Sequence, residues 1–253
     1  MKLGLFQYSP VWEDKKENKN KILDILSKGN YQTDLLIFPE MTLTGFSMKS
    51  KELAENLDGE SFIFFKNLAI EKDTNVITGL IFREVDKIFN TAVHFNSKGE
   101  IKSIYKKIHP FSPSTEDKNY EVGSQTQVTK IDNWKIGLSI CYDLRFPELY
   151  RFYAKQRTEL IIVIANWPVD RIAHWRQLLK ARAIENQCYV TGVNRVGDTG
   201  KLKYNGWSSV YNPMGKEIVG IENDEGLFIT EINIDEVKQV QNNLPFLDDI
   251  KLI

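Results

Sequence analysis

Three reactive side chains in this sequence come directly after apolar segments. Cys141, one of only two cysteines, follows the run IGLSI and precedes the charged residues Asp143 and Arg145. Glu40 ends the segment DLLIFPE, and Lys107 ends the segment IKSIYKK. A cysteine nucleophile requires a base that removes its proton and donors that stabilise the oxyanion formed in the reaction. A glutamate and a lysine can supply these functions, so the three stretches together suggest acyl transfer.

Each of these residues also has an ordinary structural interpretation. A lone cysteine at the end of a strand is usually a packed core thiol, and a single glutamate or lysine is usually solvated. Half-burial of Glu40 among apolar neighbours would instead raise its pKa toward the range of a general base. No position decides the question alone. However, all three residues lie where a predicted strand meets a loop, which is where α/β proteins assemble their sites.

Strands and helices alternate along the whole chain, without a linker or a shift in composition. Hydrophobic periodicity separates the helices from the strands, and Gly, Pro and Asn mark the turns. The pattern predicts one α/β domain over residues 1–253, with sheets covered by helices. Helices are expected at residues 17–28, 61–73, 147–156 and 171–187; strands are expected at 2–8, 34–40, three segments within 75–107, a hairpin at 126–141, 160–166, 188–194, 207–221 and 226–235; a polar loop is expected at 108–125.

Composition argues against several classes of function. The chain carries 33 basic and 34 acidic residues, so no global charge attracts nucleic acid or an anionic membrane. No apolar stretch approaches the roughly 20 residues of a membrane span, and the N-terminal apolar run is too short for a signal peptide. The histidines His94, His109 and His174 are scattered, and we expect no metal or organic cofactor. We expect a cytoplasmic protein, in which both thiols stay reduced.

Three motifs, in order and at these spacings, resemble the carbon–nitrogen hydrolase (nitrilase) superfamily: FPEMTLTGF, YKKIHPF and GLSICYDLRFPELYR. The resemblance covers almost the whole chain. It implies a Glu-Lys-Cys triad in which Glu40 is the general base, Lys107 the lysine and Cys141 the nucleophile, with Lys106 as a neighbour. It also implies that Glu116, in EDKNYEVG, is the supporting second glutamate. The implied fold is a four-layer α-β-β-α sandwich of two stacked sheets covered by helices.

Within the family, the chain looks most like the omega-amidases, which hydrolyse the terminal amide of 2-oxoglutaramate and 2-oxosuccinamate. The stretches that carry this likeness are CYDLRFPE, ANWPVDRIAHW and ARAIENQCYVTGVNRVG. Amidases acting on deaminated glutathione are the closest alternative, and Tyr-Asp after the cysteine argues against nitrile hydrolysis. The omega-amidase likeness implies a small amide substrate with a distal carboxylate. Arg145 and Arg171 are candidate partners for that carboxylate. For Arg145, a structural salt bridge with Asp143 or Glu148 is an equally good explanation. The expected substrate-binding residues are Tyr142, through its backbone N–H, Arg145, Asn166, Trp167 and Arg171.

Two further alternatives stay open at this point. A cysteine–histidine dyad is conceivable because His109 follows Lys107 by two residues, but it would leave Glu40 and Lys107 unexplained. A non-enzymatic thiol sensor on the same scaffold would keep Cys141 without needing Glu40. We interpret Cys188 as a core residue. The resemblance also implies a homodimer formed through the helices that follow Cys141 and Asn166.

Overall fold

Two mixed β-sheets form the centre of the molecule in the computed structural model, which describes residues 1–29 and 31–252. The first sheet has the strand order β13-β1-β2-β3-β4-β5. The short strand β2 runs parallel to both of its neighbours, and the other pairs are antiparallel. The strands are β1 (Lys2–Gln7), β2 (Leu35–Ile37), β3 (Asn75–Glu84), β4 (Lys87–Phe95), β5 (Ile101–Lys106) and β13 (Gly226–Glu231).

The second sheet repeats this arrangement with a parallel centre. Its order is β10-β11-β9-β8-β7-β6, and β12 pairs with β11 beside this path. Strand β8 runs parallel to β7 and β9, while the outer pairs are antiparallel. The strands are β6 (Val128–Ile131), β7 (Trp134–Ile140), β8 (Leu160–Ile164), β9 (Tyr189–Val193), β10 (Val196–Asp198), β11 (Lys203–Tyr211) and β12 (Glu217–Glu222).

The two sheets pack face to face through alternate side chains of their strands. In β7, Ile136, Leu138 and Ile140 enter the core between the sheets, together with residues of β1, β2 and β3. The intervening residues face a helix: the Tyr150 hydroxyl donates to Ser139 Oγ at 3.0 Å. Strands covered on both faces read as nearly continuous apolar runs, which explains the sequence pattern.

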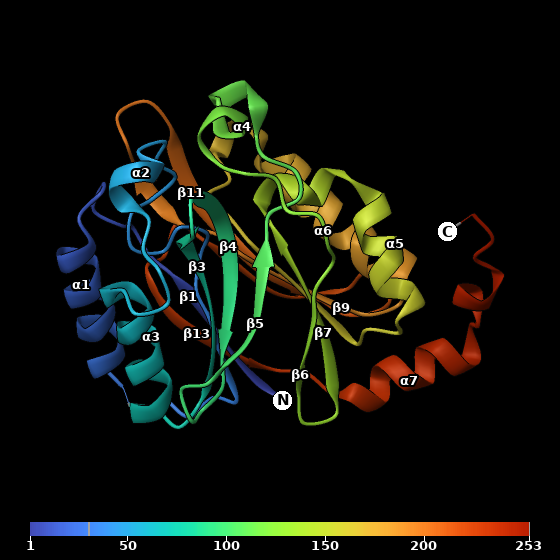
Figure 1. Cartoon of the computed structure of the whole chain (residues 1–253). Helices are drawn as coiled ribbons and strands as arrows, with labels where there is room; N and C mark the ends of the chain where they lie inside the picture. The colour runs from blue at the N-terminus through green and yellow to red at the C-terminus, as the bar shows by residue number, and fades with distance from the viewer. Residues whose placement is uncertain (30, 253) are drawn as a thin grey trace.

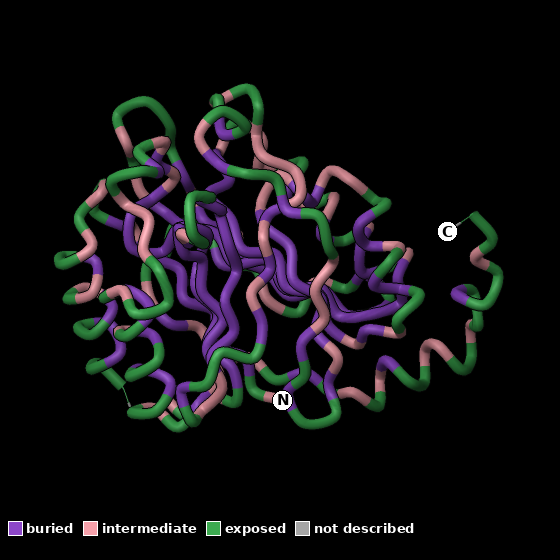
Figure 2. The backbone as a smooth tube through the Cα atoms, in the orientation of Figure 1, coloured by how far each residue is buried: buried purple, intermediate pink, exposed green. Residues whose placement is uncertain are grey.

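Helices cover the two outer faces (Figure 1). Helices α1 (Lys15–Ser27) and α3 (Glu60–Glu71) pack on the first sheet through an aromatic-rich core, whereas α5 (Pro147–Lys155) and α6 (Ile172–Asn186) pack on the second. Figure 2 shows the buried residues concentrated in the strands between these helices. The α-β-β-α layering predicted from the sequence is therefore confirmed.

Several boundaries differ from the prediction, mostly because of local caps. Helix α1 begins at Lys15 because the Asp14 side chain accepts a hydrogen bond from Glu17 N at 2.9 Å. The predicted strand 226–235 is wrong at its end: β13 stops at Glu231, and the Asn233 side chain caps a new helix, α7 (Ile234–Asn243). Short elements not predicted from the sequence are α2 (Ser50–Leu53), η1 (Ser112–Ser114) and α4 (Glu116–Asn119), the last two within the expected loop 108–125, and η4 (Phe246–Asp249) near the C-terminus.

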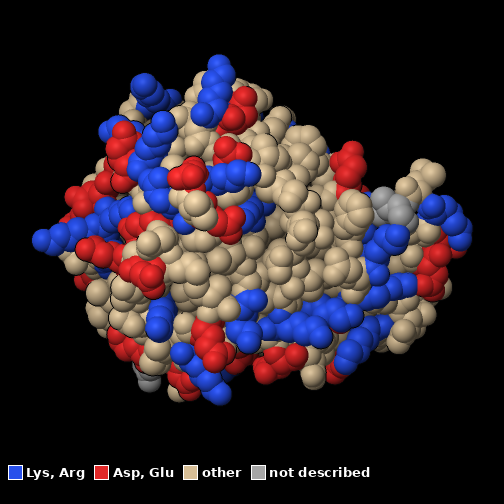
Figure 3. Space-filling view, in the orientation of Figure 1, with Lys and Arg blue, Asp and Glu red and all other residues tan. Residues whose placement is uncertain are grey.

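Acidic and basic side chains intermingle over much of the face seen in Figure 3, in keeping with their nearly equal numbers. Within residues 1–29 and 31–252, every helix is too short or too polar to cross a lipid bilayer.

Candidate active site

A lysine and two carboxylates form a buried charged cluster between the sheets. Lys107 Nζ lies 2.9 Å from Glu40 Oε1 and 2.8 Å from Glu116 Oε2. The Asn90 amide bridges the two acids, since its Nδ2 donates to Glu40 Oε1 at 2.7 Å and to Glu116 Oε1 at 2.8 Å. Lys107, Glu40 and Glu116 are all at most 1% exposed. Glu40 is therefore fully buried rather than half-buried as the sequence suggested.

Backbone contacts fix the segments that carry Glu40 and Lys107. Glu40 follows β2, and its backbone passes so close to β3 that a Cβ on Gly79 would lie 2.6 Å from Glu40 Cα. Lys107 continues the ladder past the end of β5, because its N–H donates to Asn90 O at 2.9 Å. The Lys107 carbonyl in turn accepts from Gly123 N at 2.8 Å. Both side chains thus project from rigid elements rather than from free loops.

Cys141 lies at a sharp turn between β7 and a 3₁₀ turn, η2 (Cys141–Arg145). Its φ of 47° is in the left-handed region, which a non-glycine residue adopts only when its surroundings enforce it. Asp143 supplies that enforcement: its carboxylate accepts from Ile140 N at 2.9 Å and from the Tyr105 hydroxyl at 2.7 Å. Helix α5 then begins at Pro147, as predicted. The first N–H groups of a helical turn lack internal acceptors, which leaves the Tyr142 N–H as a candidate oxyanion donor.

His109 belongs to the support of this turn. Its Nδ1 and its backbone N both bind Asp143 Oδ1, at 2.8 and 3.0 Å, and its ring stacks on Phe146 with centroids 3.9 Å apart. No hydrogen bond joins His109 to Cys141, both of which lie in the described part of the chain. The contacts of His109 therefore favour positioning over a cysteine–histidine dyad.

The buried charges set the protonation of the lysine and the thiol. Burial lowers the pKa of Lys107, but the carboxylates of Glu116 and Glu40 outweigh it and hold this pKa well above its usual value. Burial, and next the Glu40 carboxylate, raise the pKa of the Cys141 thiol well above its ordinary value, although Lys107 opposes the shift. The site at rest therefore contains an ammonium and a neutral thiol.

The Asn166 backbone connects Glu40 to the nucleophile. Asn166 N donates to Glu40 Oε2 at 2.9 Å, and the Asn166 side chain donates to the Glu40 carbonyl at 2.7 Å. The Asn166 backbone also lowers the pKa of the Cys141 thiol, against the larger effects that raise it. Asn166 follows β8, whose end lies beside that of β7 in the parallel pair. The adjoining strand ends thus bring the base and the nucleophile together.

A small cavity of about 80 Å³ opens onto Cys141. All five residues predicted to bind substrate line it, and three of them, Asn166, Trp167 and Arg171, come from the segment that follows β8 and ends with the 3₁₀ turn η3 (Val169–Arg171). The other walls are mainly apolar or aromatic. The lining consists of Tyr142, Arg145, Asn166, Trp167 and Arg171, together with Phe46, Phe111, Ser114, Cys141, Pro168, Leu202 and Tyr204.

The two arginines of the cavity have different surroundings. Arg145 packs over the Trp167 ring, 4.8 Å from its centroid, and its Nη2 lies 3.3 Å from His174 Nδ1. Within residues 1–29 and 31–252 it forms no salt bridge with Asp143 or Glu148, so that alternative interpretation of Arg145 is wrong. Arg171 packs over Phe111 at 5.6 Å.

Two residues of the site were not predicted from the sequence: Asn90, which binds both glutamates, and Tyr204, which lines the cavity. Asn90 had a detectable signal, because it is a polar residue inside the apolar strand segment IFNTAVHF. Tyr204 had none, since its position in the cavity depends on the pairing of β10 with β11.

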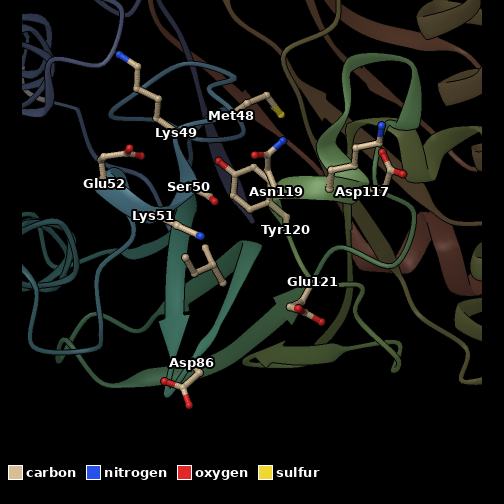
Figure 4. Close-up of a pocket in the computed structure, with 12 residues that line it drawn as sticks. Met48, Lys49, Ser50, Lys51, Glu52, Asp86, Asp117, Asn119, Tyr120 and Glu121 are labelled. Atoms are coloured by element: carbon tan, nitrogen blue, oxygen red, sulfur yellow. The ribbon is translucent and has the colours of Figure 1, made fainter.

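A larger cleft lies away from the cysteine. Its volume is about 470 Å³, and charged residues of both signs surround it, including Lys49, Lys51, Asp86 and Glu121 (Figure 4). It contains neither Cys141 nor the charged cluster, so chemistry rather than size identifies the candidate site. Among residues 1–29 and 31–252, no group of three or more His, Cys, Asp or Glu side chains is arranged to hold a metal ion.

The fold and the site define a carbon–nitrogen hydrolase. The family model "Carbon-nitrogen hydrolase" matches residues 2–242, and the chain belongs to this family of amide-hydrolysing enzymes. It is 35% identical to the "Hydrolase in agr operon" of Staphylococcus aureus, over all of this chain and 98% of that protein.

Two further relatives carry more specific names. The identity is 29% to the 2-oxoglutaramate amidase of Bacillus subtilis, over 98% of this chain and 97% of that protein. The identity to the omega-amidase YafV of Yersinia enterocolitica is 32%, over 98% of this chain and 96% of that protein. Among solved structures, a CN-hydrolase superfamily protein of Xanthomonas campestris with an arsenic adduct in its active site superposes with a TM-score of 0.93 at 30% identity, over all of this chain and 98% of that one.

Proposed function

We propose that this protein hydrolyses the terminal amide of 2-oxo dicarboxylic acid monoamides, such as 2-oxoglutaramate and 2-oxosuccinamate, to the 2-oxo acid and ammonia. The observation that carries the proposal is the cavity in which Cys141 faces two arginine side chains, Arg145 and Arg171. A substrate with an amide at one end and a carboxylate at the other matches a nucleophile opposite a cation. The relatives named 2-oxoglutaramate amidase and omega-amidase support the same substrate class.

In the first half-reaction, Glu40 accepts the Cys141 proton while Sγ attacks the amide carbonyl carbon. A carbon–sulfur bond forms, and the carbonyl electron pair moves onto the oxygen. Lys107 and the Tyr142 N–H stabilise this oxyanion, an effect worth roughly 3–4 kcal/mol for one good donor. The tetrahedral intermediate collapses with cleavage of the carbon–nitrogen bond, and Glu40 returns its proton to the leaving ammonia.

In the second half-reaction, Glu40 removes a proton from water as the water oxygen attacks the thioester carbon. The carbon–sulfur bond breaks, the free acid leaves, and the proton on Glu40 returns to Cys141. Glu116 holds the Lys107 ammonium through two contacts of 2.8 and 3.0 Å, which keeps the cation aimed and charged through both steps. Every proton transfer thus passes through one carboxylate, which acts as a base and then as an acid in each half-reaction.

Deaminated glutathione is the second candidate substrate, because amidases that act on it share the Tyr-Asp-Leu-Arg-Phe-Pro stretch that follows the cysteine in this chain. It is tested in the same assay.

The test is ammonia release from 2-oxoglutaramate by the purified protein, with glutamine, deaminated glutathione and a simple nitrile as competing substrates. We expect rapid release from 2-oxoglutaramate and loss of activity in Cys141→Ala, whose circular dichroism should match that of the unchanged protein. Cys188→Ala is the matched control, because this thiol is buried away from the cavity. Faster hydrolysis of deaminated glutathione would make it the proposed substrate in place of 2-oxoglutaramate. Near-normal turnover in Cys141→Ala would reject the mechanism.

We also propose that the protein acts in the cytoplasm, where its two free thiols stay reduced.

We further propose that the protein is a homodimer. The outer faces of α5 and α6 expose Phe152 and Ile184, each nearly half exposed, and Figure 3 shows a broad uncharged area near α5. Light scattering coupled to size exclusion should give twice the chain mass. Substitution of both Phe152 and Ile184 by lysine should then yield a monomer, and a monomeric starting protein would contradict the proposal.

A further inference from the structure

Arg195 is a buried cation without a matching anion. Its side chain is 1% exposed; Nε donates to Val196 O at 3.1 Å, and Nη1 has no partner. Among the described residues, no Asp or Glu forms a salt bridge with it, and Glu225 acts on it only from longer range. An unpaired buried charge is expensive, and proteins usually compensate it with an ion pair. No carboxylate in contact with Arg195 cancels its positive charge, which therefore acts on the neighbouring side chains.

Tyr204 separates Arg195 from the active-site cavity. The Arg195 guanidinium lies over the Tyr204 ring, 4.5 Å from its centroid. Tyr204 is 7% exposed and lines the cavity together with Cys141 and Arg171. Its hydroxyl forms no hydrogen bond with any residue in 1–29 or 31–252, although a buried tyrosine hydroxyl normally finds a partner. This unpaired hydroxyl belongs to a side chain that lines the cavity, so a substrate oxygen could accept its hydrogen bond.

The charges around Tyr204 identify the expected ligand atom. Burial, the largest effect, raises the pKa of Tyr204 to about 12 although Arg195 and Arg171 oppose it, so the hydroxyl keeps the proton that it can donate. Arg145 is already engaged with Trp167 and His174. The Arg171 guanidinium, in contrast, forms no hydrogen bond with any residue in 1–29 or 31–252, so this guanidinium and the Tyr204 hydroxyl both have donors free for an anionic oxygen.

We propose that Tyr204 and Arg171 bind the distal carboxylate of the substrate, and that Arg195, behind the Tyr204 ring, is a positioning residue that strengthens this subsite. The inference rests on the proposed function, because it assigns the carboxylate-binding residues of the same cavity. A hydrogen bond to a charged group contributes enough that its loss weakens binding about ten- to a hundredfold. The effect should fall on ligands that carry a carboxylate and spare those that do not.

The experiment measures protection of Cys141 from iodoacetamide by glutarate, a dicarboxylate without an amide. Tyr204→Phe keeps the ring over Arg195 and removes only the donor, so we expect at least a tenfold higher glutarate concentration for half-protection. Tyr211→Phe is the matched control: it lies on the same strand, but its hydroxyl binds Glu217 at 3.0 Å outside the cavity. Arg195→Met should weaken protection as well, and Arg195→Lys should restore part of it by keeping the charge.

Kinetics supply the second readout. In Tyr204→Phe, KM for 2-oxoglutaramate should rise at least tenfold with little change in kcat, and the ratio of kcat/KM for 2-oxoglutaramate to kcat/KM for pentanamide should fall at least tenfold. Equal protection by glutarate in Tyr204→Phe and in the unchanged protein would overturn the inference, as would a protein that glutarate does not protect. The protein could also fail to hydrolyse 2-oxoglutaramate while glutarate still protects Cys141 in a way that depends on Tyr204. That result would reject the proposed substrate but support the carboxylate-binding subsite.

Discussion

Replacement of Lys107 by methionine tests the charged cluster most directly. Methionine retains the length and apolar stem of the side chain but removes the ammonium that lies 2.9 Å from Glu40 and 2.8 Å from Glu116. Asn90 would still hold both carboxylates through one amide nitrogen, so the two acids could not move apart freely. The substitution therefore leaves two adjacent buried acids without their cation.

The expected cost follows from this burial. Removing one partner of a buried ion pair typically costs about 3–5 kcal/mol, because the remaining charge stays desolvated. In Lys107→Met the two adjacent buried acids should share one proton, which glutamates of the unfolded chain release above a pH of about 4.3. The variant therefore loses stability as pH rises above this value, by about 1.4 kcal/mol per pH unit for one proton. The deficit relative to the unchanged protein should be small at pH 5 and large at pH 8.

Urea unfolding of both proteins at pH 5, 6.5 and 8 measures this deficit. Lys106→Met provides the control, because Lys106 is the neighbouring residue but pairs with Glu84 near the surface, where an ion pair contributes at most about 1 kcal/mol. A pH-independent deficit in Lys107→Met, or one no larger than that of Lys106→Met, would refute the buried-cluster reasoning. Hydrolysis should also be lost in Lys107→Met and retained in Lys106→Met.

Three further perturbations have defined outcomes. Burial lowers the pKa of His94 to about 4, so stability should fall by up to about 3 kcal/mol as pH drops from 6.5 to 4; in urea titrations His94→Gln should lack this part of the slope. Gly79→Ala would place a methyl group 2.6 Å from Glu40 Cα, and activity should drop at least tenfold while circular dichroism shows a folded protein. Because the pKa of Cys141 is raised, alkylation by iodoacetamide should still be increasing with pH above pH 9; a plateau near pH 7 would contradict this.

The layered fold could be predicted because burial on both faces gives the central strands a clear sequence pattern. The apolar runs that end before Glu40 and Cys141 are parallel-sheet strands, and their carboxyl ends lie where chemistry was expected. Helix α7 was missed for a local reason. An Asn233 cap, rather than hydrophobic periodicity, decides that the chain leaves the strand and becomes helical.

The contacts made by the supporting residues of the site could not be predicted, because they depend on pairings between distant segments. Asn90 reaches Glu40 across 50 residues, and Asp143 binds His109 across 34. Spacing along the chain does not encode such contacts. Burial of Glu40 was underestimated for the same reason: Asn166, 126 residues away, covers its carboxylate through a backbone N–H.

The arrangement of charges also explains why a nucleophilic cysteine can rest as a neutral thiol. One ammonium between two carboxylates leaves the buried cluster with a net negative charge. Ionisation of Cys141 beside it would add a second buried negative charge. That cost disappears when the thiol proton passes to Glu40 during attack, since negative charge then moves from the carboxylate to the substrate oxygen beside Lys107. The same lysine thus neutralises Glu40 at rest and the oxyanion during reaction. The thiolate need not exist before the substrate arrives, which protects the cysteine from side reactions between turnovers.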